Sequence, residues 1–260
     1  MSDVTYDNTY VAFLDILGFK DLVERNDHAV LNEIFNDNID EVLLEIQTDS
    51  KNLIDGDYNI QYLSVSDSII FWSDGDDPHD FLTLCFVVRG ILTIFLSLGI
   101  PLRGGIARGP LTVKNNKQNM NIFGKGLTKA YMIENGQQWS GAVIDPEIIN
   151  HLNVTYDFTV EKLDSILIYY KVPFSHGKIL EFWVINWSYE FAYAPDDVHP
   201  EELIKSSFSK YNKNVDDWSV QNKIDNTLKF YQDSMVTSFL IKSRKLLDGE
   251  IYQIEQSEIS

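Results

Sequence analysis

Short and long apolar stretches alternate along the chain, and this alternation predicts strands interleaved with helices. Short β-rich runs are typical of strands, and longer apolar or amphipathic stretches are typical of helices. The predicted strands cover residues 9–16, 58–64, 68–72, 101–107, 110–113, 142–145, 165–172 and 179–187. Six of them form three predicted pairs: 58–64 with 68–72, 101–107 with 110–113, and 165–172 with 179–187. The predicted helices cover residues 19–25, 31–46, 81–98, 126–135, 146–152 and 220–247. This order predicts an α/β (α+β) sandwich of the ferredoxin-like βαββαβ type with a mixed sheet.

The chain is long enough for one substantial core. It has 260 residues, of which 44% are hydrophobic, and it shows neither an internal repeat nor a Pro/Gly/Ser linker. We expect one domain over residues 8–190. After residue 196 the composition turns polar and helical, which predicts a C-terminal helical extension over residues 197–250 that packs on this domain or dimerises with it.

Charge and cysteine content narrow the classes of function. The net charge is −18, which opposes general nucleic-acid binding but leaves room for a phosphate-bearing small ligand. The single cysteine, Cys85, lies in an apolar stretch and predicts a buried thiol, so a disulfide within the chain and a multi-cysteine zinc site are both excluded. No leader peptide is evident, and we expect a cytoplasmic protein.

One stretch, residues 81–100, is long enough to span a bilayer. Arg89 lies near its middle, where a charge costs about 2.5–3.5 kcal/mol on insertion scales. We therefore expect a buried or interface helix here and no membrane span.

Two aspartates interrupt apolar surroundings. Asp15 ends the first predicted strand, and Asp67 lies in the turn of the first predicted hairpin. Each has an ordinary explanation, as a helix cap for Asp15 and as a turn residue for Asp67. Together they could converge on one edge of the sheet, where two carboxylates suit Mg²⁺ or Mn²⁺ held jointly with substrate phosphates.

A glycine-rich strand with arginines follows, in the sequence RGGIARG that begins at Arg103. Its glycines allow close backbone packing, and its arginines could bind phosphate oxygens in a bidentate manner. A glycine-rich strand with surface arginines is the ordinary alternative.

Four motifs appear in the order found in the class III nucleotidyl cyclase domain, which the chain resembles over about residues 10–187: FLDILGF, the SDS hairpin, RGGIARG and GKGLTKAYMIE. The resemblance implies a head-to-tail homodimer with two interfacial sites and two Mn²⁺ or Mg²⁺ ions in each. It implies that Asp15, Asp67 and the Ile16 carbonyl bind the metals and that Arg103 contacts pyrophosphate. Other candidates for contact with the substrate that it implies are Phe19, Asn121, and Lys171 or Lys178 as the phosphate-binding lysine.

Departures from the purine cyclases suggest a smaller base. The family's base-reading lysine would fall near Tyr62 and Leu63, and its aspartate near Asn121, so Tyr62 could stack on, or hydrogen-bond to, a smaller base. In this respect the chain resembles the pyrimidine cyclases of bacterial antiphage signalling (the Pycsar systems). The resemblance implies that UTP, favoured over CTP, is converted to a cyclic monophosphate that a separate effector protein reads in antiviral defence.

A second departure concerns the helix over residues 126–135. Thr128 and Met132 occupy positions where the family has Asn and Arg, so either Lys125, Lys129 or Arg108 replaces the arginine or activity is low. We expect Met132 to pack in the core. The alternatives are a catalytically inactive nucleotide-binding or regulatory domain and an oligomerisation module.

Overall fold

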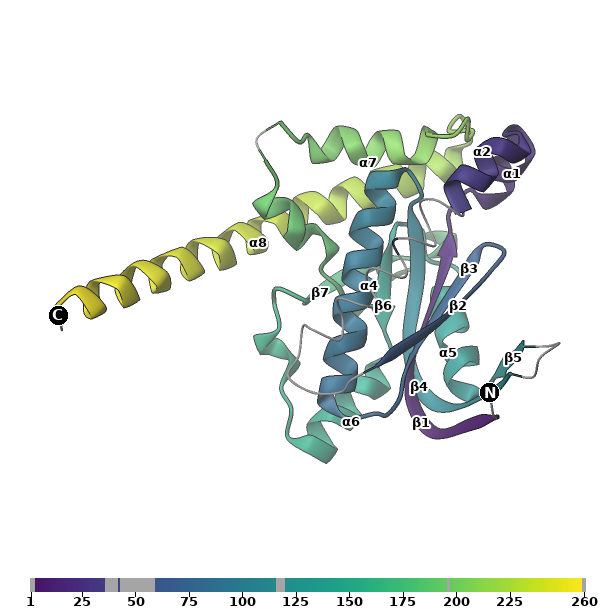
Figure 1. Ribbon diagram of the computed structural model, residues 1–260. Coiled ribbons are helices and arrows are strands. Elements are labelled where there is room, and N and C mark those ends of the chain that lie inside the picture. Colours follow the sequence, from purple (N-terminus) through teal and green to yellow (C-terminus); the bar gives the residue numbers. More distant parts are fainter. Residues whose placement is uncertain (1–2, 36–41, 43–58, 116–119, 196, 259–260) are drawn as a thin grey trace.

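The structure is a computed structural model that describes residues 3–35, 42, 59–115, 120–195 and 197–258 (Figure 1). In this part of the chain eight strands form one sheet in the order β2-β3-β1-β4-β6-β8-β7, with β5 paired to β4. Only the β4–β6 pair is parallel among the described strands. The strands are β1 (Val4–Ile16), β2 (Ile60–Val65), β3 (Ser68–Ser73), β4 (Leu102–Asn115), β5 (Met120–Phe123), β6 (Gly141–Ile144), β7 (Leu167–Pro173) and β8 (Ile179–Ile185).

The strand order confirms the predicted ferredoxin-like sandwich. The chain runs from β1 through α1 (Phe19–Arg25) and α2 (His28–Asn32) to the β2–β3 hairpin, and then through α4 (Pro78–Leu98) to β4. The helical crossovers place β1 between β3 and β4, antiparallel to both. This is the βαββαβ arrangement, extended at the β4 side by β6, β8 and β7.

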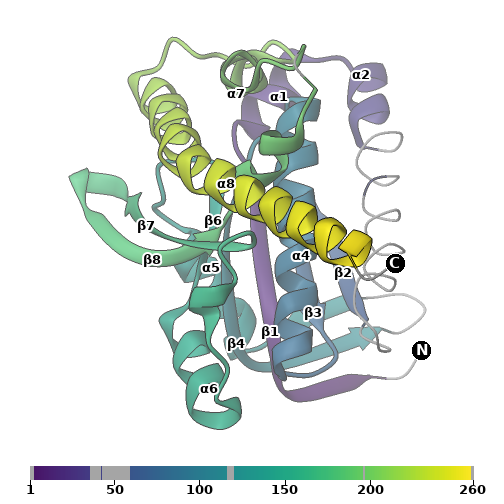
Figure 2. The same cartoon turned by 90° about the vertical axis from the view of Figure 1, so that its left-hand side faces the viewer.

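Helices cover both faces of the sheet, and Figure 2 shows β1 between α4 and α5 (Lys125–Glu134). Successive side chains of a strand point to opposite faces. Tyr10, Ala12 and Leu14 therefore join the main core with α4, whereas Val11 and Phe13 face α5. We call these the α4 face and the α5 face of the sheet.

Helix α4 is the predicted apolar helix. It is long and apolar enough to cross a membrane, with mean hydropathy 2.2, but 56% of that stretch is buried inside the protein. Cys85 is fully buried in it, as predicted. Arg89 is accommodated by an ion pair with Glu190 at 2.8 Å and a hydrogen bond to the Ser165 carbonyl, so the central charge is compensated within the fold.

The two strands predicted over residues 101–107 and 110–113 are one continuous strand, β4 (Leu102–Asn115), so the prediction of a strand pair was wrong. Two residues of β1 between Tyr6 and Thr9 lie opposite Pro110, because the β1–β4 register shifts there. Such a bulge relieves the missing amide of a proline, so the strand continues through it. Strand β1 also begins earlier than predicted, β5 was not predicted, and most of the predicted helix over residues 31–46 lies outside the described residues.

The remaining α-helices described are α6 (Pro146–Tyr156), α7 (Pro200–Ser209) and α8 (Trp218–Glu258). Short 3₁₀ helices precede β7, lie between β7 and β8, and follow β8: η2 (Val160–Lys162), η3 (Ser175–Gly177) and η4 (Trp187–Tyr193). The first half of α8 packs against the body, where Ile224, Phe230 and Met235 are buried. Figure 1 shows the later part of α8 projecting away from the sheet. The boundary between the predicted domain and its extension stays a prediction.

Close approach of α5 to β4 gives a first testable prediction. A Cβ at Gly105 would overlap the Ala130 carbonyl oxygen, so Gly105→Ala must push α5 away from the sheet. Overpacking of this kind costs roughly 1–3 kcal/mol. We expect a lower Tm by thermal denaturation together with loss of any ligand-induced Tm shift.

Gly177→Ala is the matched control, because nothing lies within 4 Å of its Cβ position and only its φ of 71° opposes the change. It should lower the Tm without altering the ligand-induced shift. A Gly105→Ala variant as stable as the parent protein would contradict the packing described here.

Candidate functional site

Asp15 lies on the α5 face at the end of β1, two positions beyond Phe13. Its Cα neighbours across the sheet are Ser68 in β3 and Arg103 in β4. The Asp15 side chain is 22% exposed, so its carboxylate is neither in bulk water nor fully enclosed.

The β2–β3 turn brings a second carboxylate to the same strand end. Ser66 takes up the left-handed conformation with φ 58°, and the Ile16 amide donates a hydrogen bond of 2.8 Å to the Asp67 carbonyl. The negative charge of Asp67 contributes to raising the pKa of Asp15. The structure therefore brings Asp15, Ile16 and Asp67 together, as the sequence predicts.

A third carboxylate, Glu134, was not predicted. It ends α5, is 3% exposed, and forms an ion pair with the Arg103 guanidinium. Gly126, Ala130 and Glu134 are the buried positions of α5, spaced four residues apart. A carboxylate on the same helical stripe as Gly126 and Ala130 was the available sequence signal.

Arg103 is the centre of this group, which we call the acidic cluster: Asp15, Asp67, Glu134 and Arg103. Besides the ion pair with Glu134, its guanidinium lies 3.4 Å from the Asp15 carboxylate and donates a hydrogen bond of 2.9 Å to the Gln137 carbonyl. Three partners hold the guanidinium in one orientation, which suits it to recognise an anion at a defined position.

The acidic cluster holds three carboxylates and one guanidinium, so it has less positive than negative charge. Burial raises the pKa of Asp15 to about 7, the charges of Glu134 and Asp67 raise it as well, and Arg103 opposes them. Burial also raises the pKa of Glu134 against the influence of Arg103. One guanidinium does not balance three nearby carboxylates, and a divalent cation would supply the missing charge.

The donor set fits a hard cation that shares its coordination with a ligand. Carboxylate oxygens suit Mg²⁺ or Mn²⁺, which commonly bind one or two carboxylates and complete their coordination with phosphates and water. Within the described residues no three acidic, histidine or cysteine side chains are placed to form a complete metal site. Asp15 and Asp67 could therefore hold such ions only together with further oxygens.

Phe19 and Tyr62, two residues expected to contact the substrate, pack against the main core of the protein. Phe19 is half-buried and packs edge-to-face on Phe35 at 6.0 Å. Tyr62 lies opposite Phe71 and packs against the main core on the α4 face, away from Asp15. Gln61 and Leu63 alternate with it and share the α5 face with Asp15, so the expectation that Tyr62 stacks on a base at that face lacks support.

Helix α5 presents its predicted substrate residues to the outside. Lys125 and Thr128 are exposed, and the Thr128 hydroxyl donates to the Gly124 carbonyl at 3.1 Å. Met132 is 68% exposed, so the expectation that it packs in the core was wrong. It faces away from the sheet because the small and carboxylate positions Gly126, Ala130 and Glu134 occupy the inner face.

Other candidates lie away from Asp15 in the same chain. Asn121 is exposed on β5 opposite Lys114, which lies eleven positions along β4 from Arg103, about 36 Å at about 3.3 Å per residue. Lys171 is on β7 at the far edge of the sheet and pairs with Glu181 at 3.8 Å; Lys178 immediately precedes β8.

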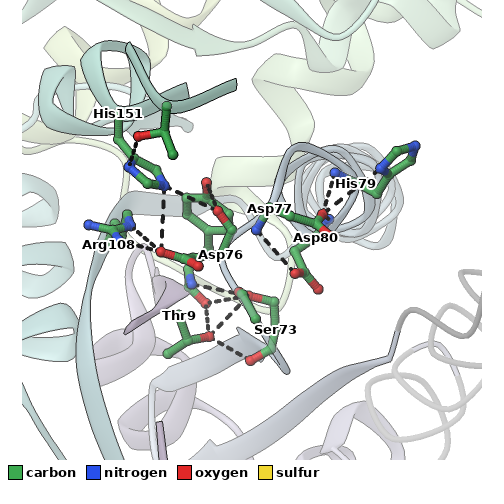
Figure 3. Close-up of polar contacts among 11 residues, drawn as sticks. Thr9, Ser73, Asp76, Asp77, His79, Asp80, Arg108 and His151 are labelled. Carbon is green, nitrogen blue, oxygen red and sulfur yellow. Dashed lines mark hydrogen bonds and ion pairs between the residues drawn. The ribbon is translucent and has the colours of Figure 1, made fainter. Parts of the chain in front are cut away.

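Two of the three cations suggested as replacements, Lys129 on α5 and Arg108 on β4, are already paired. Lys129 forms an ion pair with Glu147. Figure 3 shows Arg108 and His151 converging on Asp76, with the Arg108 Nε donating at 2.7 Å and His151 Nε2 at 3.5 Å from the carboxylate. Arg108 is five positions from Arg103, which places it on the other face of β4. Lys125 is therefore the suggested replacement for which no carboxylate pairing is found among the described side chains.

No protein-family model matches the sequence. No curated protein matches it either. Among solved structures, the chain is similar to the catalytic core of a rhodopsin-guanylyl cyclase with converted specificity in complex with ATPalphaS, with 16% identity and a TM-score of 0.47, covering 70% of this chain and 98% of that one. It is also similar to the guanylyl cyclase Cya2, with 12% identity and a TM-score of 0.46, covering 71% of this chain and 94% of that one.

A third similar structure is the non-canonical dimeric guanylyl cyclase domain of the RhoGC fusion protein from the aquatic fungus Blastocladiella emersonii. It has 15% identity and a TM-score of 0.42, covering 70% of this chain and 97% of that one. At these low scores and identities the fold is assigned from the strand order alone.

The charge imbalance at the site predicts that Asp15→Asn stabilises the metal-free protein. The raised pKa of Asp15 means that the folded state loses stability as the pH rises from about 4 through about 7. At pH 8 the variant should therefore melt higher than the parent, by about 2–4 °C for each kcal/mol regained. Added Mn²⁺ should raise the Tm of the parent and leave that of the variant unchanged.

Asp233→Asn is the control, since it removes an exposed carboxylate paired with Lys229 on α8. Exposed pairs of this kind contribute little, so its Tm and Mn²⁺ response should match the parent. A lower Tm for Asp15→Asn at pH 8 would show that the Asp15 charge is already compensated.

Proposed function

We propose that this protein is a nucleotide cyclase, a phosphorus–oxygen lyase that converts UTP, or CTP, to the 3′,5′-cyclic monophosphate and pyrophosphate. The observation that carries the proposal is the meeting of Asp15 and Asp67 beside a fixed guanidinium at one strand end. Two carboxylates do not complete the coordination of a metal ion, so they suit ions that the phosphates of a nucleoside triphosphate also bind.

In the proposed reaction the ribose 3′-oxygen forms a bond to the α-phosphorus while the bond to the β-phosphate oxygen breaks. The hydroxyl proton passes to solvent and pyrophosphate leaves. Two bound Mn²⁺ or Mg²⁺ ions would lower the pKa of the hydroxyl and neutralise phosphate charge. Asp15, Asp67 and the Ile16 carbonyl would hold them, and Arg103 would offset the charge that develops on the leaving pyrophosphate.

We infer that the working unit is a head-to-tail homodimer with interfacial sites. Asn121 and Lys171 lie far from Asp15 within one chain, so they reach a shared substrate only from a second copy. Exposed apolar side chains gather on α5 and the neighbouring strand β5: Met120, Phe123, Tyr131 and Met132. Such a patch is typical of a surface that binds protein, and Lys125 and Thr128 lie on the same helix.

A pyrimidine substrate is proposed because strand β2, IQYLSV, contains no lysine. On the α5 face it presents Gln61, Leu63 and Val65. The Gln61 amide group already donates to the Tyr6 hydroxyl at 3.0 Å and to the Asp74 carboxylate at 2.7 Å, so the pyrimidine proposal depends on the missing lysine. By the same proposal the cyclic nucleotide is a second messenger in bacterial antiviral defence, made in the cytoplasm and read by a separate effector.

A second candidate is a catalytically inactive cyclase-like domain that binds nucleotide and regulates a partner. Met132 favours it, because an exposed thioether stands where the resemblance implies a transition-state arginine. Metal-dependent turnover distinguishes the two functions.

The test is incubation of the protein with all four ribonucleoside triphosphates and Mn²⁺, followed by mass spectrometry. We expect a cyclic pyrimidine monophosphate, with UTP the better substrate. Asp67→Asn should abolish the product, because a neutral amide binds a divalent cation far more weakly than a carboxylate.

Glu161→Gln, which changes an exposed carboxylate in η2, should retain full activity. Undiminished product from Asp67→Asn would remove the metal assignment. Absence of any cyclic product from the parent, with nucleotide still bound, would favour the inactive domain.

A further inference from the structure

The segment between α5 and β6, residues 137–140, holds one side of the Arg103 guanidinium. Its first residue, Gln137, accepts the hydrogen bond of 2.9 Å from Arg103 at its backbone carbonyl. Movement of this segment would therefore displace one of the three partners that orient the guanidinium. Whatever fixes the 137–140 segment also fixes the group that is the candidate for binding pyrophosphate.

Gln137 anchors the start of the 137–140 segment in the body of the protein, where its side chain is fully buried. The side-chain amide donates at 2.8 Å to the Gly104 carbonyl of β4 and at 2.7 Å to the Ile133 carbonyl of α5. The side-chain oxygen accepts from the Trp139 indole at 2.9 Å. Because a buried polar group without a partner is costly, these bonds hold the carboxamide in one orientation.

The other end of the 137–140 segment is anchored by α8. The Thr227 hydroxyl is fully buried and accepts a hydrogen bond of 2.9 Å from the Ser140 amide. The Asn226 side chain donates at 2.7 Å to the Gln138 carbonyl. Backbone groups of the segment are thus paired with two adjacent side chains of the C-terminal helix.

Trp139 adds an aromatic contact with the same helix. It is fully buried, and Phe230 of α8 packs against its ring nearly edge-on, with 4.7 Å between the ring centroids. Phe230 follows Thr227 by three positions, so both side chains lie on the face of α8 that meets the body. Residues 138, 139 and 140 therefore each contact α8, and the preceding residue holds Arg103.

We propose that α8 positions the Arg103 guanidinium, with Thr227 as the positioning residue that acts through the 137–140 segment. Thr227 holds the Ser140 amide at one end of this buried segment, and the Gln137 carbonyl at the other end holds Arg103. The inference rests on the proposed cyclase function for the task of Arg103 and extends it, because it gives the C-terminal extension a part in the site. The alternative is that α8 stabilises the fold and leaves the guanidinium unaffected.

NMR of the Arg103 guanidinium N–H groups in the full chain without ligand tests the positioning directly. The signals are assigned by their loss in Arg103→Lys, and we expect slow exchange with solvent in the parent because three partners hold the group. Thr227→Val leaves the Ser140 amide unpaired, so the segment should shift and the Arg103 signals should broaden and exchange faster. Thr227→Ser keeps the hydroxyl and should restore them. The Arg89 guanidinium, which is paired with Glu190, should give unchanged signals in every variant.

Calorimetry with inorganic pyrophosphate and Mg²⁺ gives the functional readout. Thr227→Val should weaken pyrophosphate binding by roughly two- to thirtyfold, the range for residues that act through a network of contacts, and should lower kcat/KM for UTP in the same direction. Thr227→Ser should keep the parent affinity. In the Arg103→Lys background, Thr227→Val should have no further effect, because both changes act on the same group.

Ser234→Ala is the matched control. Ser234 also places a fully buried hydroxyl on α8, but this hydroxyl lies 2.6 Å from that of Ser188 in η4. The variant should lower the Tm and leave the Arg103 signals and the pyrophosphate affinity unchanged. Asn226→Ala, at a half-buried position, makes the same test as Thr227→Val with a smaller loss of packing, in case that variant does not fold.

Rapidly exchanging Arg103 signals in the parent would overturn the proposal, and so would parent-like signals in Thr227→Val or Asn226→Ala. Equal changes in the Arg103 and Arg89 signals would also overturn it, because they would indicate general loosening of the fold. If Arg103 responds as expected but the parent neither binds pyrophosphate nor forms a cyclic nucleotide, the positioning stands and the cyclase function fails. If the parent turns over UTP and Thr227→Val matches it in signals and kcat/KM, the cyclase function stands and the positioning fails.

Discussion

The site depends on three carboxylates held around one guanidinium at the end of β1. Half-buried like charges are costly unless they are compensated, and Arg103 compensates them only in part. The fold maintains the arrangement because Asp15, Asp67 and Glu134 come from three rigid elements, a strand end, a two-residue hairpin turn and a helix end. None of them can move away without breaking the sheet register or the packing of α5.

The C-terminal extension is coupled to this site by direct contacts. The Asn214 amide donates to Asp21, Asn26 donates to the Tyr211 carbonyl at 2.6 Å, and the Lys213 side chain lies against Gly18. These contacts fix the turn that follows Asp15. A helix that looks like an appendage in Figure 1 therefore has its first turns beside Leu17 and Gly18, which follow Asp15 and Ile16 in the chain.

Much of the fold could be predicted from the sequence, because strand and helix periodicities differ and the apolar runs are well separated. Asp15 and Asp67 could also be found, since a carboxylate beside buried strands is costly and therefore informative. Pro110 led to the wrong prediction of a strand break, because β4 continues through it at a bulge that depends on the partner strand β1. The orientation of Tyr62 could not be found, because it depends on which face of the strand meets the site.

The positions of the other candidate substrate-binding residues favour a site shared between two copies of the chain. A single chain supplies an acidic, metal-suited half at the end of β1 and leaves Asn121, Lys171 and the exposed apolar face of α5 elsewhere. A closed two-fold arrangement would join each half to the complementary half of a second copy and cover that apolar face in the same step.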